Sequence, residues 1–226
     1  MNNKEFTKNL CIKNNWDFQA LEKYFNLVSE HNKFINLTGF KDDRLWGEGI
    51  LESLIFMSQI TKDFESASIL DIGAGAGFPS IPYAIVNKNF KFTIYEPIQK
   101  RVNFLNLVID ELNLNDRVFV YCTRSEDVQQ KNIFDIVTAR TVASVRALLM
   151  SSFHLVKVNG FMRLIKSKNY QDEINEATDI ISKLKTEIKT TPMPNYNFEK
   201  ESYIVEFKKL RSTPKEFPYK WKDIKK

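Results

Sequence analysis

Apolar positions near the start of the chain recur at helical spacing. One stripe, with steps of three or four residues, consists of Phe18, Leu21, Phe25 and Val28. This spacing predicts an amphipathic helix over about 17–30. Asp42 or Asp43 is expected to cap a second helix that runs to about Ser58, because a short acidic side chain accepts hydrogen bonds from free helix amides. Residues 1–65 are therefore expected to form a helical extension.

From residue 66 onward, short apolar runs alternate with amphipathic stretches, which is typical of an α/β protein. The predicted strands are residues 68–72, 90–95, 118–121, 134–139, 161–166 and 203–207. The predicted helices start near Pro79, cover 98–112 and 143–156, and include a last one with the stripe Ile174, Ala177, Ile181, Leu184 and Ile188. Strands that alternate with helices form a parallel sheet with right-handed crossovers. We therefore expect a sheet domain over 66–208 and a basic tail over 209–226.

A glycine-rich turn follows the first predicted strand. Gly73, Gly75 and Gly77 occupy every second position, and Glu96 ends the next predicted strand. Glycines let the backbone approach a ligand, and a carboxylate at a strand tip can accept both ribose hydroxyl protons. A dinucleotide fingerprint needs its third glycine at position 78, where this chain has Phe78. The spacing favours an S-adenosylmethionine (SAM) site, with the glycines beside the methionine part and Phe78 either covering the ligand or packing in the core.

Three further strand tips carry candidate chemistry, because ligands of parallel sheets bind beyond the carboxyl ends of the strands. After the third strand, Ser125 and Glu126 can supply a donor and an acceptor for adenine, although they could equally begin a helix. Arg140 and Lys166 place a cation at each of the next two tips. Two cations suit an acceptor that brings phosphates or a guanine oxygen, while the alternative for Arg140 is a structural ion pair.

Two motifs that the sequence lacks narrow the choice of the group that would accept the methyl group of SAM. Methylation of an exocyclic amine typically uses an Asn/Asp-Pro-Pro-aromatic run at the fourth tip, where this chain has Thr138-Ala139-Arg140-Thr141. Methylation of pyrimidine carbon 5 needs a cysteine nucleophile, and Cys122 is expected in a buried strand. Cys11 is the only other cysteine, so neither a disulfide nor a metal site is expected. His31 and His154 lie in predicted helices away from the strand tips.

Positive charge is concentrated at the C-terminal end. The net charge is +5, and residues 207–226 carry eight Lys or Arg against Glu216 and Asp223, so the rest of the chain is nearly neutral. A basic tail with Tyr219 and Trp221 can bind phosphates and stack on bases; the alternative is a solubilising, disordered end. The sequence has no apolar run near the ~20 residues of a membrane span and no signal-peptide core. We expect a cytoplasmic protein without a membrane partner.

Short motifs spread over most of the chain form a recognisable set. They are Asn36-Leu37-Thr38, the run from Asp71 to Pro82, Lys100-Arg101-Val102-Asn103-Phe104-Leu105, Ser125-Glu126, Ala139-Arg140-Thr141-Val142-Ala143 and Leu164-Ile165-Lys166. Over about 34–207 this set resembles the bacterial RsmG family, also called glucose-inhibited division protein B, and 213–218 looks like the basic ending of many members. The resemblance implies a Rossmann-like SAM-dependent methyltransferase fold, with a mostly parallel seven-stranded sheet and an antiparallel C-terminal strand.

The resemblance also implies a reaction and a site. The family transfers the methyl group of SAM to ring nitrogen 7 of a guanosine in 16S rRNA of the small ribosomal subunit, leaving S-adenosylhomocysteine. By position, its SAM contacts fall on Gly73, Phe78, Ser125, Glu126 and Arg140, with Glu96 at the ribose. No general base is expected, because ring nitrogen 7 is unprotonated. Arg140 and Lys166 are expected to position the guanine or its phosphate.

The chain departs from the family pattern at four positions. Gly49 and Glu52 stand where the family usually has His and Asp, and Ser80 and Ser167 replace glycines. Two alternatives stay open: a SAM-dependent methyltransferase that acts on a small molecule or a protein, and a non-catalytic SAM-binding factor for RNA or ribosome assembly. Nothing in the sequence demands a dimer, so a monomer is expected.

Overall fold

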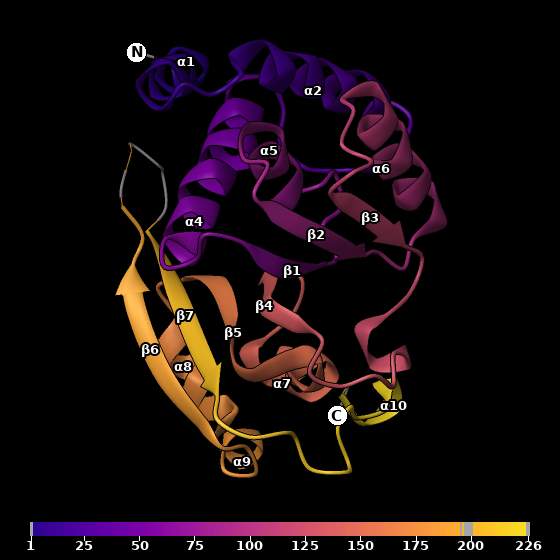
Figure 1. Ribbon diagram of the computed structural model, residues 1–226, viewed down its shortest axis with the longest axis vertical. Coiled ribbons are helices and arrows are strands. Elements are labelled where there is room, and N and C mark those ends of the chain that lie inside the picture. Colours follow the sequence, from indigo (N-terminus) through magenta and orange to yellow (C-terminus); the bar gives the residue numbers. More distant parts are fainter. Residues whose placement is uncertain (1, 195, 197–200, 225–226) are drawn as a thin grey trace. The chain divides into compact units, whose positions relative to one another are not determined.

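The computed structural model describes residues 2–194, 196 and 201–224. The chain folds as two compact units, which we call unit 1 (Met1–Ser66 with Gly73–Cys122) and unit 2 (Ala67–Ile72 with Thr123–Lys226). Its strands form a seven-stranded mixed sheet in the order β3-β2-β1-β4-β5-β7-β6 (Figure 1). This order confirms the predicted α/β class. No helix within the described ranges is long and apolar enough to cross a membrane.

Unit 1 contains two strands and the helices that precede the sheet. Its elements are α1 (Asn3–Asn14), α2 (Phe18–His31), α3 (Asp42–Arg44), the π-helix η1 (Leu45–Leu51), α4 (Glu52–Thr61), α5 (Ser80–Val86), β2 (Phe90–Tyr95), α6 (Gln99–Glu111) and β3 (Val118–Tyr121). The helix predicted over 17–30 is confirmed as α2, which buries Leu21, Tyr24 and Val28. Helix α1 escaped prediction because it buries only Thr7 and Cys11 and so shows no apolar stripe.

The predicted cap of the second helix is wrong. Asp42 has a φ of 48° and lies inside α3, and the residue before it makes no side-chain capping bond. The Asp43 carboxylate instead accepts from the backbone amide of Asn3 at 2.9 Å and from the Asn3 side chain at 2.8 Å. Asp43 therefore satisfies an orphan donor at the start of α1. A partner forty residues away cannot be read from local sequence.

Unit 2 contains the other five strands. Its elements are β1 (Ala67–Ile72), η2 (Ser125–Asp127), β4 (Phe134–Arg140), α7 (Val145–Ser152), η3 (Phe153–Leu155), β5 (Val156–Ser167), α8 (Tyr170–Glu176), α9 (Thr178–Ile181), β6 (Thr186–Pro192), β7 (Ser202–Lys209) and α10 (Trp221–Ile224). The pairs β1–β4 and β4–β5 are parallel, whereas β5–β7 and β6–β7 are antiparallel (Figure 1). The predicted antiparallel strand near the C-terminus is confirmed as β7.

The helix predicted through Ile188 is wrong in its second half. Helix α9 ends at Ile181, and Ile188 lies in the edge strand β6. Thr186, Ile188 and Thr190 put a β-branched residue at every second position, which favours a strand. Ile188 is 40% exposed, so its place in the helical stripe was coincidental. The helix predicted over 143–156 is also shorter, because strand β5 begins at Val156.

Candidate functional site

The glycine-rich turn of unit 1 is packed too tightly for larger residues. Gly73, Gly75 and Gly77 have φ values of 66°, 60° and 111°, in the region that residues with a Cβ rarely adopt. A Cβ on Gly75 would lie 3.1 Å from the Leu37 carbonyl oxygen, and one on Gly77 would collide with the Ile81 side chain. The backbone of this turn therefore has a conformation that strongly favours glycine.

Glu96 lies beside this turn with its carboxylate held by backbone amides. The side chain is 1% exposed. Its Oε2 accepts from the Gly75 amide at 3.1 Å, and its Oε1 accepts from the Ile98 amide at 3.0 Å. Each oxygen keeps a second lone pair, so the carboxylate can still accept two hydroxyl protons. The predicted pairing of the glycine turn with Glu96 is thus present within unit 1.

A second loop braces this arrangement. The Asn32 side-chain oxygen accepts from the amides of Leu37 and Thr38 at 2.9 and 3.1 Å, and its amide group donates to the Thr38 carbonyl at 2.9 Å. The Arg101 guanidinium donates to the Asn36 carbonyl at 3.2 and 3.1 Å and lies 3.9 Å from Glu96 Oε2. The motif Asn36-Leu37-Thr38 lies in this loop, but the role of Asn32 was not predicted. The available signal was an Asn just before an apolar turn.

Phe78 packs inside unit 1. Its side chain is 5% exposed and lies edge-on to Tyr24, with ring centroids 5.9 Å apart, and 6.5 Å from the Phe40 ring. A Cβ on Gly49 would come within 2.9 Å of the Phe78 ring, so this ring occupies the space that a larger residue at position 49 would need. These contacts favour a Phe78 side chain that packs in the core over one that covers the ligand. Its backbone is then the part of Phe78 that can contact a ligand.

In unit 2, Ser125 and Glu126 form the short helix η2. The Ser125 hydroxyl lies 2.7 Å from the Ser152 hydroxyl, which lies 2.7 Å from that of Ser151. The Glu126 side chain is 6% exposed, and its Oε1 has no hydrogen-bond partner among the described residues, although the Arg124 guanidinium lies 3.9 Å from it. Because a buried carboxylate oxygen without a donor is costly, this atom is suited to receive a donor from a ligand, such as an exocyclic amine.

Arg140 and Lys166 lie at the ends of neighbouring parallel strands of unit 2. Arg140 ends β4, is 8% exposed and is in register with Ile165 of β5. The Lys166 ammonium is 2.7 Å from a Glu173 carboxylate oxygen and donates to the Ala143 carbonyl at 2.7 Å. The same Glu173 oxygen accepts from the amide at the start of α7. Lys166 therefore ties the exposed loop after β4 to α8, in addition to any contact with a substrate.

The two histidines and Cys122 are the remaining residues that the sequence analysis considered. His31 lies at the end of α2, with Nδ1 3.0 Å from the Leu27 carbonyl. His154 is fully buried, and burial lowers its pKa to about 4. The prediction of a buried Cys122 is wrong, because the residue is exposed just after β3.

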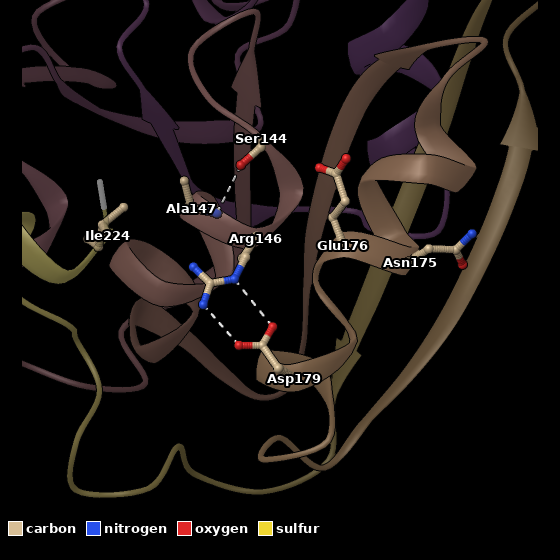
Figure 2. Close-up of a pocket in the computed structure, with 7 residues that line it drawn as sticks. All are labelled: Ser144, Arg146, Ala147, Asn175, Glu176, Asp179 and Ile224. Carbon is tan, nitrogen blue, oxygen red and sulfur yellow. Dashed lines mark hydrogen bonds and ion pairs between the residues drawn. The ribbon is translucent and has the colours of Figure 1, made fainter. Parts of the chain in front are cut away.

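Unit 2 also contains an open cavity of about 620 Å³ (Figure 2). It is lined by Ser144, Arg146, Ala147, Asn175, Glu176, Asp179 and Ile224. The side chains of Arg146 and Asp179 point toward one another and form a two-pronged ion pair, with nitrogen–oxygen distances of 3.3 and 2.9 Å (Figure 2). None of the predicted site residues lines this cavity.

Comparison with known proteins gives one consistent result. The family model for rRNA small subunit methyltransferase G (GidB) matches residues 17–201. A ribosomal RNA small subunit methyltransferase G from Mycoplasmopsis pulmonis is 38% identical over 208 residues, covering 90% of this chain and 89% of the relative. The one from Streptococcus gordonii is 34% identical over 207 residues, covering 88% and 86%.

Solved structures show the same fold at low sequence identity. TYW2 from M. jannaschii in complex with AdoMet matches with a TM-score of 0.53 and 19% identity, covering 73% of this chain and 77% of that one. A SAM-dependent methyltransferase from Aquifex aeolicus matches with a TM-score of 0.52 and 15% identity, covering 69% and 90%. The predicted methyltransferase fold is therefore confirmed. With the family match over most of its length, the chain belongs to the rRNA small subunit methyltransferase G (GidB) family.

Proposed function

We propose that this protein transfers the methyl group of SAM to ring nitrogen 7 of a guanosine in 16S rRNA of the small ribosomal subunit. The observation that carries the proposal is the Gly75–Glu96 arrangement in a chain of this family. The methyl acceptor and the nucleotide position follow the family resemblance. Because the acceptor is ribosomal RNA, the reaction takes place in the cytoplasm.

The residues suit SAM in three respects. Gly73 and Gly75 carry no side chain, so the backbone of the turn can approach the methionine part, and the Phe78 backbone adjoins it. The Glu96 carboxylate accepts hydrogen bonds from the two ribose hydroxyls. Glu126 accepts a hydrogen bond from the exocyclic amine of adenine, which satisfies its buried oxygen. Ser125 and Arg140 complete the proposed set of cofactor contacts.

The chemistry asks little of the protein beyond positioning. Ring nitrogen 7 of guanine carries a lone pair at neutral pH, so no base must remove a proton before attack. The sulfonium of SAM is a good leaving group, and the positive charge passes from sulfur to the purine ring as the methyl group moves. Holding nitrogen and methyl in line at near-attack distance then supplies most of the rate enhancement. The buried, neutral His154 is not needed as a base.

We further propose that Arg140 and Lys166 position the guanine or its phosphate. A guanidinium can donate two parallel hydrogen bonds to the guanine edge or to a phosphate. Lys166 holds the loop after β4 through Glu173, so its effect on the substrate includes the placement of this loop.

The test combines the purified protein with methyl-labelled SAM and small ribosomal subunits that lack the modification. Label at one guanosine, mapped by cleavage at 7-methylguanosine, is the expected result. Arg140→Ala should remove most of this activity. Transfer to a protein or a small molecule but to no ribosomal form would refute the proposed acceptor. SAM binding without transfer to any acceptor would indicate a non-catalytic factor.

A further inference from the structure

Within the residues that the structure describes, the basic C-terminal segment packs onto unit 2. We call residues 210–224 the strap. Its backbone is tied down at both ends, because the Leu210 amide donates to the Lys185 carbonyl at 2.9 Å and the Tyr219 amide donates to the Met150 carbonyl at 3.0 Å. Between these points, Lys131 donates to the Pro214 carbonyl at 2.9 Å. The alternative of a disordered end, which the sequence allowed, therefore does not apply to residues 210–224.

Apolar residues of the strap point into unit 2. Phe217 is 1% exposed and Ile224 is 8% exposed. Lys209, which precedes the strap, is also buried: its ammonium donates to the carbonyls of Phe153, His154 and Val156 at 3.0, 3.1 and 2.7 Å. Burial lowers the pKa of Lys209 to about 7. Lys209 is therefore part of the fold and does not count among the cations that a partner can reach.

The other cations of the strap are on its outer surface. Arg211, Lys215, Lys220 and Lys222 are all exposed. None of the four forms an ion pair with another residue that the structure describes. Unpaired cations held on an ordered backbone repel one another, and they present a site where a polyanion gains binding free energy by releasing its counterions.

One aromatic residue of the strap connects it to the proposed cofactor residues. The Arg124 guanidinium lies over the Trp221 ring, 4.6 Å from its centroid, and Trp221 is 42% exposed. Arg124 directly precedes Ser125 and lies 3.9 Å from the Glu126 carboxylate. A ligand that stacks on Trp221 would therefore contact the segment that contains Ser125 and Glu126 through a single side chain.

We propose that the strap is an RNA-binding surface, in which Arg211, Lys215, Lys220 and Lys222 contact phosphates and Trp221 stacks on an unpaired base. The identity of the RNA rests on the proposed function, whereas the surface rests on the charges and contacts of the strap. Cations alternating with an aromatic residue are typical of surfaces that bind single-stranded nucleic acid. A membrane surface fits less well, because the strap turns Phe217 and Ile224 inward and offers no continuous apolar face.

The test compares two triple variants of the full chain with equal loss of charge. The strap variant is Lys215→Gln, Lys220→Gln, Lys222→Gln, and the control is Lys8→Gln, Lys13→Gln, Lys88→Gln, at exposed positions of unit 1. Binding to an unmodified 16S rRNA transcript is measured without SAM at several salt concentrations. The strap variant should bind about 10- to 100-fold more weakly, with a salt slope lower by about 2, while the control changes less than about 3-fold.

Trp221 is tested separately, with folding checked by the free energy of unfolding. Trp221→Ala should weaken RNA binding about 10-fold, and Trp221→Phe should restore most of it, because either ring can stack. Equal RNA affinity and salt slope in the strap variant and the wild type would overturn the proposal, as would an equal loss in the control. If the strap variant lost binding to phosphatidylglycerol vesicles but kept its RNA affinity, the surface would be assigned to membranes instead of RNA. Because no methyl transfer is measured, failure of the proposed reaction would leave this result intact.

Discussion

The two loops proposed to bind SAM are held in different ways. The glycine turn of unit 1 is fixed mainly by backbone: positive φ angles, the Gly75 amide on Glu96, and the Leu37 carbonyl packed against Gly75. The segment that contains Ser125 and Glu126 in unit 2 is held by side chains from distant parts of the chain. Ser152 bonds Ser125, and Trp221 lies against Arg124. A turn whose backbone requires glycines can be recognised from a short sequence motif. A segment held by side chains that are distant in the sequence leaves no such motif.

This contrast implies different responses to mutation. Substitutions in the glycine turn should act by steric strain and reduce both stability and SAM affinity. Substitutions among the supports of Ser125 should act through positioning, with smaller effects on affinity. The following predictions test this difference.

The largest effect is expected at Gly77. Its φ of 111° and the contact with Ile81 leave no room for a Cβ, so Gly77→Ala should lower the free energy of unfolding by about 2–3 kcal/mol and weaken SAM binding by about 100-fold or more. Gly39→Ala is the matched control, because a Cβ there meets nothing within 4 Å. Denaturant unfolding and calorimetric titration with SAM measure both quantities. A Gly77→Ala variant as stable as Gly39→Ala would show that the turn can relax.

Glu96→Gln should have the next largest effect, on both SAM affinity and stability, because its amide nitrogen would face a backbone amide that now donates to the carboxylate. A neutral amide replaces a charged acceptor of the ribose hydroxyls, and charged hydrogen bonds contribute about 1.5–3 kcal/mol. We expect SAM affinity to fall about 10- to 100-fold. Glu111→Gln, at an exposed ion pair with Lys23, should leave SAM affinity unchanged. Wild-type affinity in Glu96→Gln would remove the carboxylate from the proposed cofactor contacts.

The same contrast explains what the sequence could predict. The strands β2 and β3 matched their predicted ranges, and Glu96 lies beside the glycine turn, as expected for residues at the tips of neighbouring strands. By contrast, the π-helix η1, the Asp43–Asn3 contact and the Glu173–Lys166 pair depend on residues that meet only after folding. The strand β6 was missed because Ile188 satisfied a helical and a strand period at once.

Acid should destabilise unit 2 through His154. Its Nε2 lies 2.8 Å from the Val128 carbonyl, its buried Nδ1 has no partner in the described chain, and Lys209 and Lys131 disfavour a second proton. The folded-state pKa of about 4 lies below the ordinary value of 6.5, so the unfolded state binds the proton first as pH falls. Stability from this group is present above pH 6.5 and is lost between 6.5 and 4, by at most about 1.4 kcal/mol per pH unit.

The free energy of unfolding, measured across this pH range, should therefore depend less on pH in His154→Gln than in the wild type. This variant keeps a donor for the Val128 carbonyl but has no titrating group. His31→Gln, at the end of α2, serves as the control and should keep the wild-type slope. An unchanged slope in His154→Gln would mean that other groups carry the acid sensitivity.

The smallest expected effect, and the sharpest test of the contrast, is at Ser152. Its hydroxyl supports Ser125 and bonds Ser151, so Ser152→Ala removes a support without touching the proposed cofactor contacts themselves. One neutral hydrogen bond contributes about 1 kcal/mol, so KM for SAM should rise about 5-fold with little change in kcat. Ser182→Ala, whose hydroxyl donates to the Asp179 carbonyl at 3.0 Å, should leave both unchanged. If Ser152→Ala lowered SAM affinity as much as Gly77→Ala, side-chain supports and backbone strain would be equally important, and the distinction between the two loops would fail.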